Sequence, residues 1–197
     1  MNVARQVHND FQHGPQGWCS YDYHASIVSG GTNVFILAIW SGGGGPKESG
    51  HVWTDHTRWS ADTPERPLSI LPLLFYRSWI DAESIDLCDS EVSVYLRGDD
   101  LRLDGASCYF WAHALGTRWH LTGQPLRIES GGWSATPNRI HLKPDEAQWH
   151  CSWSIDPNDP TPLTDVLGTA ASYGFSFAGF SSEVSGRLSM AEFEIRT

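Results

Sequence analysis

The sequence predicts an all-β protein, an antiparallel β-sandwich of the jelly-roll type with about ten strands. Three observations support this fold class. Short runs of apolar and aromatic residues recur along the chain, and several alternate with polar residues at a period of two. The 19 Gly and 11 Pro residues interrupt the chain at regular intervals. Clean helical periodicity over about 12 residues occurs nowhere.

The strand candidates follow one another with turn-forming connectors between them. They cover residues 18–28, 33–40, 70–78, 91–97, 107–114, 117–122, 125–129, 148–154, 173–180 and 187–195. The connectors 41–50, 60–67 and 156–162 are rich in Gly, Pro, Ser and Asp, and each is too short to link domains. A single helical turn is expected at 161–167.

Length and composition indicate one domain spanning residues 1–197 and narrow the choice of partner. The excess of 23 acidic over 13 basic side chains gives a net charge of −10, which disfavours nucleic acid and anionic membranes. No apolar run is long enough to span a bilayer, and the N-terminal stretch lacks a signal-peptide core. A cytoplasmic location is therefore the default expectation. The negative net charge fits a neutral or cationic ligand better, and the ten Trp and 12% aromatic residues are many for a chain of this size.

The four cysteines, Cys19, Cys88, Cys108 and Cys151, are far apart in the sequence and form no metal-binding motif. Cys108 and Cys151 lie among large apolar residues at positions expected to face a core. We therefore expect buried free thiols rather than disulfides.

The stretch CYFWAHALGTRWHL at 108–121 separates by parity into two faces. One face carries small and apolar residues and is a core face. The other gathers Tyr, Trp, His and Arg. Extending the parity to 91–97 and 148–154 predicts a core cluster of Phe110, Trp119, Trp149 and Trp153. If these strands share one sheet, its outer surface carries Tyr95, Arg97, Tyr109, Trp111, His113, Arg118, His120 and His150.

Aromatic rings mixed with planar hydrogen-bonding groups are typical of concave ligand sites. Sugars suit such a surface, because their C–H faces stack on an indole and their hydroxyls bond to Arg, His and Tyr. The first hypothesis is glycan binding with Trp111 as the stacking platform. The second is a polysaccharide lyase or sugar hydrolase that uses His113, His120, His150 or Tyr109, with Arg97 or Arg118 holding an acidic sugar. We expect the hairpin at Gly116 to place His113 and His120 opposite each other, where a metal ion remains an option.

The segments TRWHL, PLRIESGGWS, QWHCSWS and YGFSFAGFSSEVSGRLSMAEFEI resemble bacterial and laminin-B-like jelly-roll modules of the galactose-binding or carbohydrate-binding type. The resemblance covers about 90 residues and includes the pattern of the last strand. It implies glycan binding on a sheet face or in end loops. It also implies a structural Ca²⁺ ion held by Glu192, with Asp10 or Asp22 contributing.

Two further motifs resemble ligand sites but predict none. The run SGGGGPKES lacks the Gly-Lys-Ser/Thr ending of a phosphate loop and is expected to be a flexible loop, a candidate mobile lid. His51, Asp55 and His56 lie close together in the sequence, but the spacing supplies no third metal ligand. We expect His51 and His56 to be ordinary hydrogen-bonded histidines.

Overall fold

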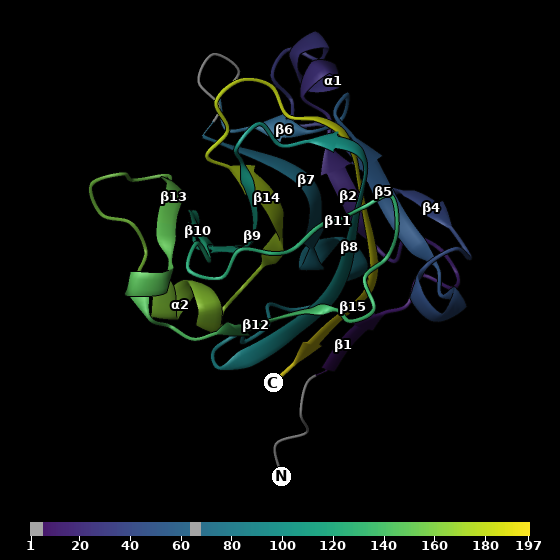
Figure 1. Ribbon diagram of the computed structural model, residues 1–197. Helices are drawn as coiled ribbons and strands as arrows, with labels where there is room; N and C mark the ends of the chain where they lie inside the picture. The colour runs from purple at the N-terminus through teal and green to yellow at the C-terminus, as the bar shows by residue number, and fades with distance from the viewer. Residues whose placement is uncertain (1–5, 64–67) are drawn as a thin grey trace.

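The computed structural model describes residues 6–63 and 68–197 and contains two β-sheets packed face to face (Figure 1). Residues 1–5 of the N-terminal stretch and the end of the 60–67 connector lie outside the described residues. The two-sheet sandwich predicted from the sequence is confirmed.

The seven-stranded sheet has the order β11 (Glu129–Ser130), β8 (Ser90–Arg102), β15 (Ser185–Arg196), β5 (His51–Asp55) and β4 (Ile39–Ser41). In addition, β1 (Gln6–Asn9) pairs with β15, and β12 (Asn138–Leu142) pairs with β8. All of these pairings are antiparallel except that of β11 with β8. The first and last strands therefore lie side by side.

The eight-stranded sheet has the order β13 (His150–Ser154), β10 (Thr117–His120), β9 (Ser107–Ala114), β14 (Ser172–Ala178), β7 (Ser69–Tyr76), β2 (Trp18–Tyr21) and β3 (Phe35–Leu37). The short β6 (Ser60–Ala61) adds to β7. The helical segments are α1 (Tyr23–Val28), α2 (Leu163–Gly168) and three 3₁₀ turns, Pro46–Glu48, Arg77–Ile80 and Glu146–Gln148.

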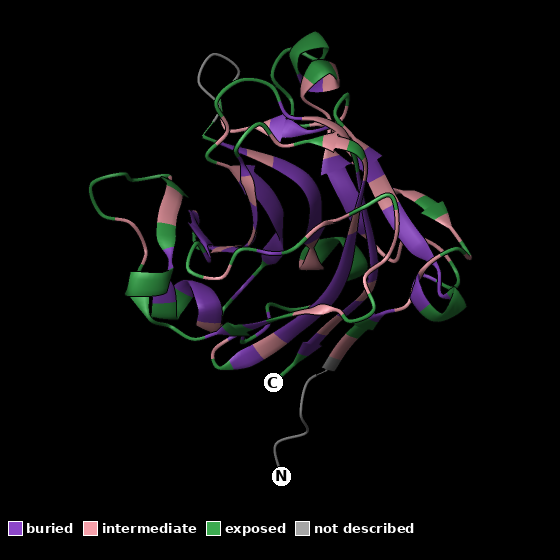
Figure 2. Cartoon of the chain, in the orientation of Figure 1, coloured by how far each residue is buried: buried purple, intermediate pink, exposed green. Residues whose placement is uncertain are grey.

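The core lies between the sheets, where the buried residues concentrate (Figure 2). Alternate residues of β14 point inward and are all aromatic: Tyr173, Phe175 and Phe177. Trp18 from β2 stacks on Phe175 at 5.9 Å between ring centroids and meets Phe193 of β15 edge-on at 4.8 Å. Each fully buried side chain of this size contributes about 1.5–3 kcal/mol, so this aromatic layer is a main source of stability.

The secondary structure differs from the sequence prediction in several segments. The segment 23–28 is helix α1 and not the end of a strand, because the Asp22 side chain accepts a hydrogen bond from Ala25 N at 2.9 Å and caps it. The segment 33–40 contains two strands, β3 and β4, which belong to different sheets. The strands β1, β5, β6 and β12 were not predicted, although β12 alternates exposed polar and buried apolar residues. The predicted helical turn at 161–167 is confirmed as α2.

Two predicted groupings are wrong. Strand β8 belongs to the seven-stranded sheet, so Tyr95 and Arg97 do not share a face with the residues of β9 and β10. Trp153 is 44% exposed, although Phe110, Trp119 and Trp149 are buried as expected. The reason is a bulge: Trp119 faces Cys151 across the β10–β13 pair, whereas Arg118 faces Trp153, so Ser152 is an extra residue. The bulge moves Trp153 from the core side to the outer side of the sheet.

All four cysteines are free thiols, as predicted. Cys108 is buried in the core, while Cys151 is only partly buried. Burial raises the pKa of the Cys108 thiol well above its ordinary range. The core thiol is therefore protonated and unreactive in the native protein.

Candidate functional site

A cleft of about 380 Å³ lies on the outer face of the eight-stranded sheet. The sequence of β14, SYGFSFA, explains why this face is hollow. Its inward residues are aromatic, whereas its outward residues, Ser172, Gly174 and Ser176, are small. A β-carbon at Gly174 would lie 2.3 Å from the Leu73 carbonyl oxygen and 3.1 Å from the indole of Trp111. The missing side chain lets the neighbouring strand residues close over β14 and form the floor of the cleft.

Trp111 forms this floor and is not an exposed platform. Its side chain is only 2% exposed, and it packs in a small apolar cluster with Cys19, Leu71 and Leu74. The indole Nε1 donates a hydrogen bond to the Phe175 carbonyl oxygen at 3.1 Å. The parity argument placed Trp111 on the correct face. Its burial on that face follows from packing against the outward residues of the strands beside it.

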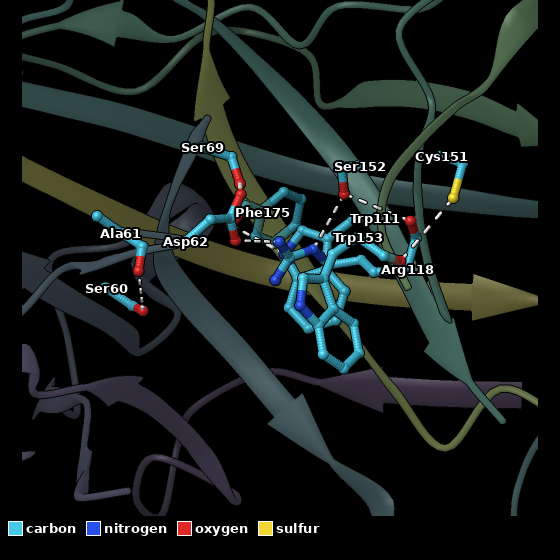
Figure 3. Close-up of polar contacts among 10 residues, drawn as sticks. All are labelled: Ser60, Ala61, Asp62, Ser69, Trp111, Arg118, Cys151, Ser152, Trp153 and Phe175. Carbon is cyan, nitrogen blue, oxygen red and sulfur yellow. Dashed lines mark hydrogen bonds and ion pairs between the residues drawn. The ribbon is translucent and has the colours of Figure 1, made fainter. Parts of the chain in front are cut away.

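A buried ion pair crosses the cleft. Figure 3 shows Asp62, which follows β6, directed at the guanidinium group of Arg118 on β10. Arg118 also donates from Nε to Ser152 Oγ at 3.1 Å, and its guanidinium carbon lies 5.9 Å from the Trp111 ring centroid. The second carboxylate oxygen of Asp62 accepts a hydrogen bond from Ser69 Oγ at 2.5 Å. Both carboxylate oxygens are thus used, while part of the guanidinium makes no hydrogen bond to the described residues.

His113 supplies a neutral polar group beside this pair. Its Nδ1 lies 3.2 Å from Ser172 Oγ, and its ring lies 6.0 Å from that of Trp153. Burial, and secondly the positive charge of Arg118, lower the pKa of His113. The imidazole is therefore neutral at pH 7 and presents one donor and one acceptor.

Aromatic side chains form the two ends of the cleft. Trp153 stands at the β13 end. At the other end the lining includes Tyr21, Phe35 and Tyr76, from β2, β3 and β7. Phe35 meets Tyr76 edge-on at 5.4 Å, and the exposed Trp79 stacks on Tyr76 at 4.6 Å. The cleft thus has a polar and apolar floor between two aromatic ends.

The predicted site residues are distributed among three surroundings. Trp111, His113 and Arg118 line the cleft. Tyr109, His120 and His150 belong to the same sheet but are outside the lining. Tyr95 and Arg97 are on the other sheet, where the Arg97 guanidinium carbon lies 4.8 Å from the Trp133 ring centroid.

The expected pairing of His113 with His120 is wrong. The strand register places His113 opposite Arg118 and His120 opposite Trp111, because the hairpin pairs Ala114 with Thr117. His120 is buried, and that burial, followed by the charges of Arg118 and His150, holds its pKa well below the ordinary value. The two histidines therefore do not present a shared site for a metal ion.

The sequence prediction missed Tyr21, Phe35, Asp62 and Tyr76 as lining residues, and it assigned Trp153 to the core. The alternation of small and aromatic residues in β14 was a usable signal for the hollow. Asp62 gave no such signal, because it lies in a Pro-rich connector 56 positions from Arg118.

The Gly-rich loop lies on the other sheet and does not cover the cleft. Two side chains from outside the loop contact its backbone: His51 Nδ1 lies 3.0 Å from Gly43 O, and Trp133 Nε1 donates to Gly44 O at 2.7 Å. His51 is a hydrogen-bonded histidine, as expected. It belongs to strand β5 rather than to a loop.

The carboxylates proposed for a calcium ion have different environments. Asp22 Oδ1 accepts the hydrogen bond that caps α1, and Asp10 Oδ1 accepts from Gln12 N and Gln16 Nε2. Asp10 directly follows β1, whose last pair joins Asn9 to Phe193 of β15. Glu192 Oε2 is 3.2 Å from His8 Nε2. Among residues 6–63 and 68–197 no group of three or more His, Cys, Asp or Glu is arranged to hold a metal ion. A calcium ion bound by Glu192 with Asp10 or Asp22 stays a prediction.

The chain shares its β-sandwich fold with several solved structures, one of which is a carbohydrate-binding module. No protein-family model matches the sequence, and no curated protein matches it. A family 11 carbohydrate-binding module from Clostridium thermocellum, solved in complex with a β-1,3-1,4-mixed-linked tetrasaccharide, aligns with a TM-score of 0.53 and 8% identity. The alignment covers 99% of this chain and 96% of that module.

Two other solved structures share the fold. The L4b domain of human laminin α-2 aligns over 98% of this chain and 97% of that domain, with a TM-score of 0.51 and 8% identity. An exo-β-agarase aligns over 96% of this chain with a TM-score of 0.50 and 7% identity, and the alignment covers 25% of the agarase. These likenesses confirm the predicted resemblance at the level of the fold. Within the described residues, no helix has the length and apolar character needed to cross a membrane.

Proposed function

We propose that this protein binds a glycan in the cleft of the eight-stranded sheet. The observation that carries this proposal is the position of Trp153. Its indole is 44% exposed at one end of a cleft whose other end is also aromatic. An exposed indole beside a floor that also carries polar groups suits the apolar C–H face of a sugar ring.

The floor supplies complementary hydrogen bonds. Arg118 donates through the N–H groups that Asp62 and Ser152 leave free. His113 offers its Nε2, which makes no hydrogen bond to the described residues. Asn33 at the aromatic end adds an amide. A sugar hydroxyl both donates and accepts, so each of these groups has a matching partner on a glycan.

The position of the catalytic candidates favours binding over catalysis. Only His113 of the four residues suggested for acid–base chemistry lines the cleft. Asp62 is the one carboxylate among the described lining residues, and both of its oxygens are already bonded. Glycoside hydrolysis by a pair of carboxylates would need a second, free acid.

The mixed-linked β-glucan tetrasaccharide bound by the structurally similar module is a reasonable first probe. The test is titration calorimetry with this tetrasaccharide and a wider glycan array. We expect Trp153→Ala to weaken binding about tenfold or more, since stacking is worth on the order of 1 kcal/mol beyond the area it buries.

The matched control is Trp40→Ala. Trp40 is 41% exposed, similar to Trp153, but it lies on β4 of the other sheet. Equal losses in both variants, or unchanged binding in Trp153→Ala, would remove the cleft as the glycan site.

A further inference from the structure

Among the described residues, one ion pair accounts for the formal charges that line the cleft. Of its fourteen described lining residues, only Asp62 and Arg118 carry a formal charge at pH 7. His113 is uncharged there, as argued above. The two charges cancel, so the floor is polar but electrically neutral.

This pair is sheltered from water. The Asp62 side chain is 6% exposed and that of Arg118 is 10% exposed. Ser69 and Ser152 bond to the two members from either side and fix their geometry (Figure 3). A buried pair of this kind interacts much more strongly than a solvated one, and solvent ions screen it less. Arg118 is therefore committed to Asp62 and has little free charge for a ligand carboxylate.

We propose that Asp62 is a specificity-determining residue, which restricts the cleft to uncharged sugars by neutralising Arg118. This inference rests on the proposed glycan-binding function and names its ligand class. An acidic sugar entering the cleft would approach Asp62 as closely as Arg118. Its carboxylate would lose hydration without gaining an unpaired cation. Neutral hydroxyls meet no such penalty.

The decisive variant is Asp62→Asn. The amide has the same shape and retains an oxygen acceptor, but it removes the negative charge and leaves Arg118 unneutralised. An Arg–carboxylate contact is a strong, charge-assisted hydrogen bond. We expect Asp62→Asn to increase affinity for an oligogalacturonate by tenfold or more. Affinity for the mixed-linked glucan tetrasaccharide should change by less than about threefold.

Two further variants make this test specific. In Asp62→Asn/Arg118→Gln the gained affinity for oligogalacturonate should disappear, because the cation is gone. Glu91→Gln changes the net charge equally and breaks an exposed pair with Arg139 on the other sheet, 2.9 Å between the charged atoms. It should gain nothing. The titrations are run at about 0.15 M salt, where electrostatic interactions between exposed charges are largely screened beyond roughly 8 Å.

The outcomes separate the two proposals. If wild-type protein binds oligogalacturonate as tightly as it binds neutral glucan, the role proposed for Asp62 is wrong. The proposed glycan binding would not be affected by that result. No affinity gain in Asp62→Asn, or an equal gain in Glu91→Gln, also overturns it. If wild-type protein binds no neutral glycan on the array, the proposed function fails. Even then, an affinity of Asp62→Asn for oligogalacturonate that disappears in Asp62→Asn/Arg118→Gln would support the inference that Asp62 neutralises Arg118.

Discussion

Truncation of two tryptophans on the same sheet face should lower the free energy of unfolding by very different amounts. Trp111 is 2% exposed and its Nε1 is bonded to Phe175 O, whereas Trp153 is 44% exposed at the edge strand β13. Trp111→Ala removes a buried indole and leaves a cavity, which costs about 3–5 kcal/mol. For a domain of this size that corresponds to a fall in Tm of roughly 6–20 °C. Trp153→Ala removes a partly solvated ring and should cost about 1 kcal/mol or less.

Glycan affinity should depend directly on Trp153, whereas Trp111 should affect it only through the stability of the fold. Trp153→Ala should remain folded at 25 °C and lose about tenfold or more in glycan affinity. The assay pairs urea unfolding, followed by tryptophan fluorescence and circular dichroism, with calorimetric titration of the glucan tetrasaccharide. A Trp153→Ala protein as destabilised as Trp111→Ala would refute the bulge at Ser152 and return Trp153 to the core. A fully stable Trp111→Ala would refute the buried floor.

Three other predictions follow from burial and charge. Cys19 and Cys108 should react slowly with a thiol reagent until the protein unfolds, because burial raises the pKa of both thiols, and reducing agent should leave Tm unchanged. His120 has a folded-state pKa well below its unfolded value, so the unfolded state takes up its proton first as the pH falls below about 6.5. Its contribution to stability is present above that pH and should decline as the pH falls further. His120→Gln should show a smaller decline in urea unfolding; an identical pH profile would contradict this assignment. If calcium binds at Glu192, EGTA should lower Tm in wild-type protein but not in Glu192→Gln, and an unchanged wild-type Tm would eliminate the site.

The local alternation of side chains determined much of the fold from the sequence alone. In 107–114 and 172–178 it separates the core aromatics Phe110 and Phe175 from the outward residues Trp111 and Gly174. This works because successive residues of a strand point to opposite faces whatever lies around them. The correct face for Trp111, His113 and Arg118 follows from it. The fold class needed the Gly and Pro spacing as well, and the free cysteines were predicted from their wide separation and the lack of a metal-binding motif.

Tertiary structure alone decided which strands share a sheet and which side chains contact each other on its outer face. The parity of β8 was predicted correctly, yet Tyr95 and Arg97 lie on the opposite sheet because topology sends β8 to pair with β15. One extra residue, Ser152, turned Trp153 outward and shifted the local pattern by one position. Asp62 reaches Arg118 only because β6 and β10 converge on the same face in space. Period-two alternation is a property of neighbouring residues, whereas these contacts depend on strand order and register, which are set by packing across the whole chain.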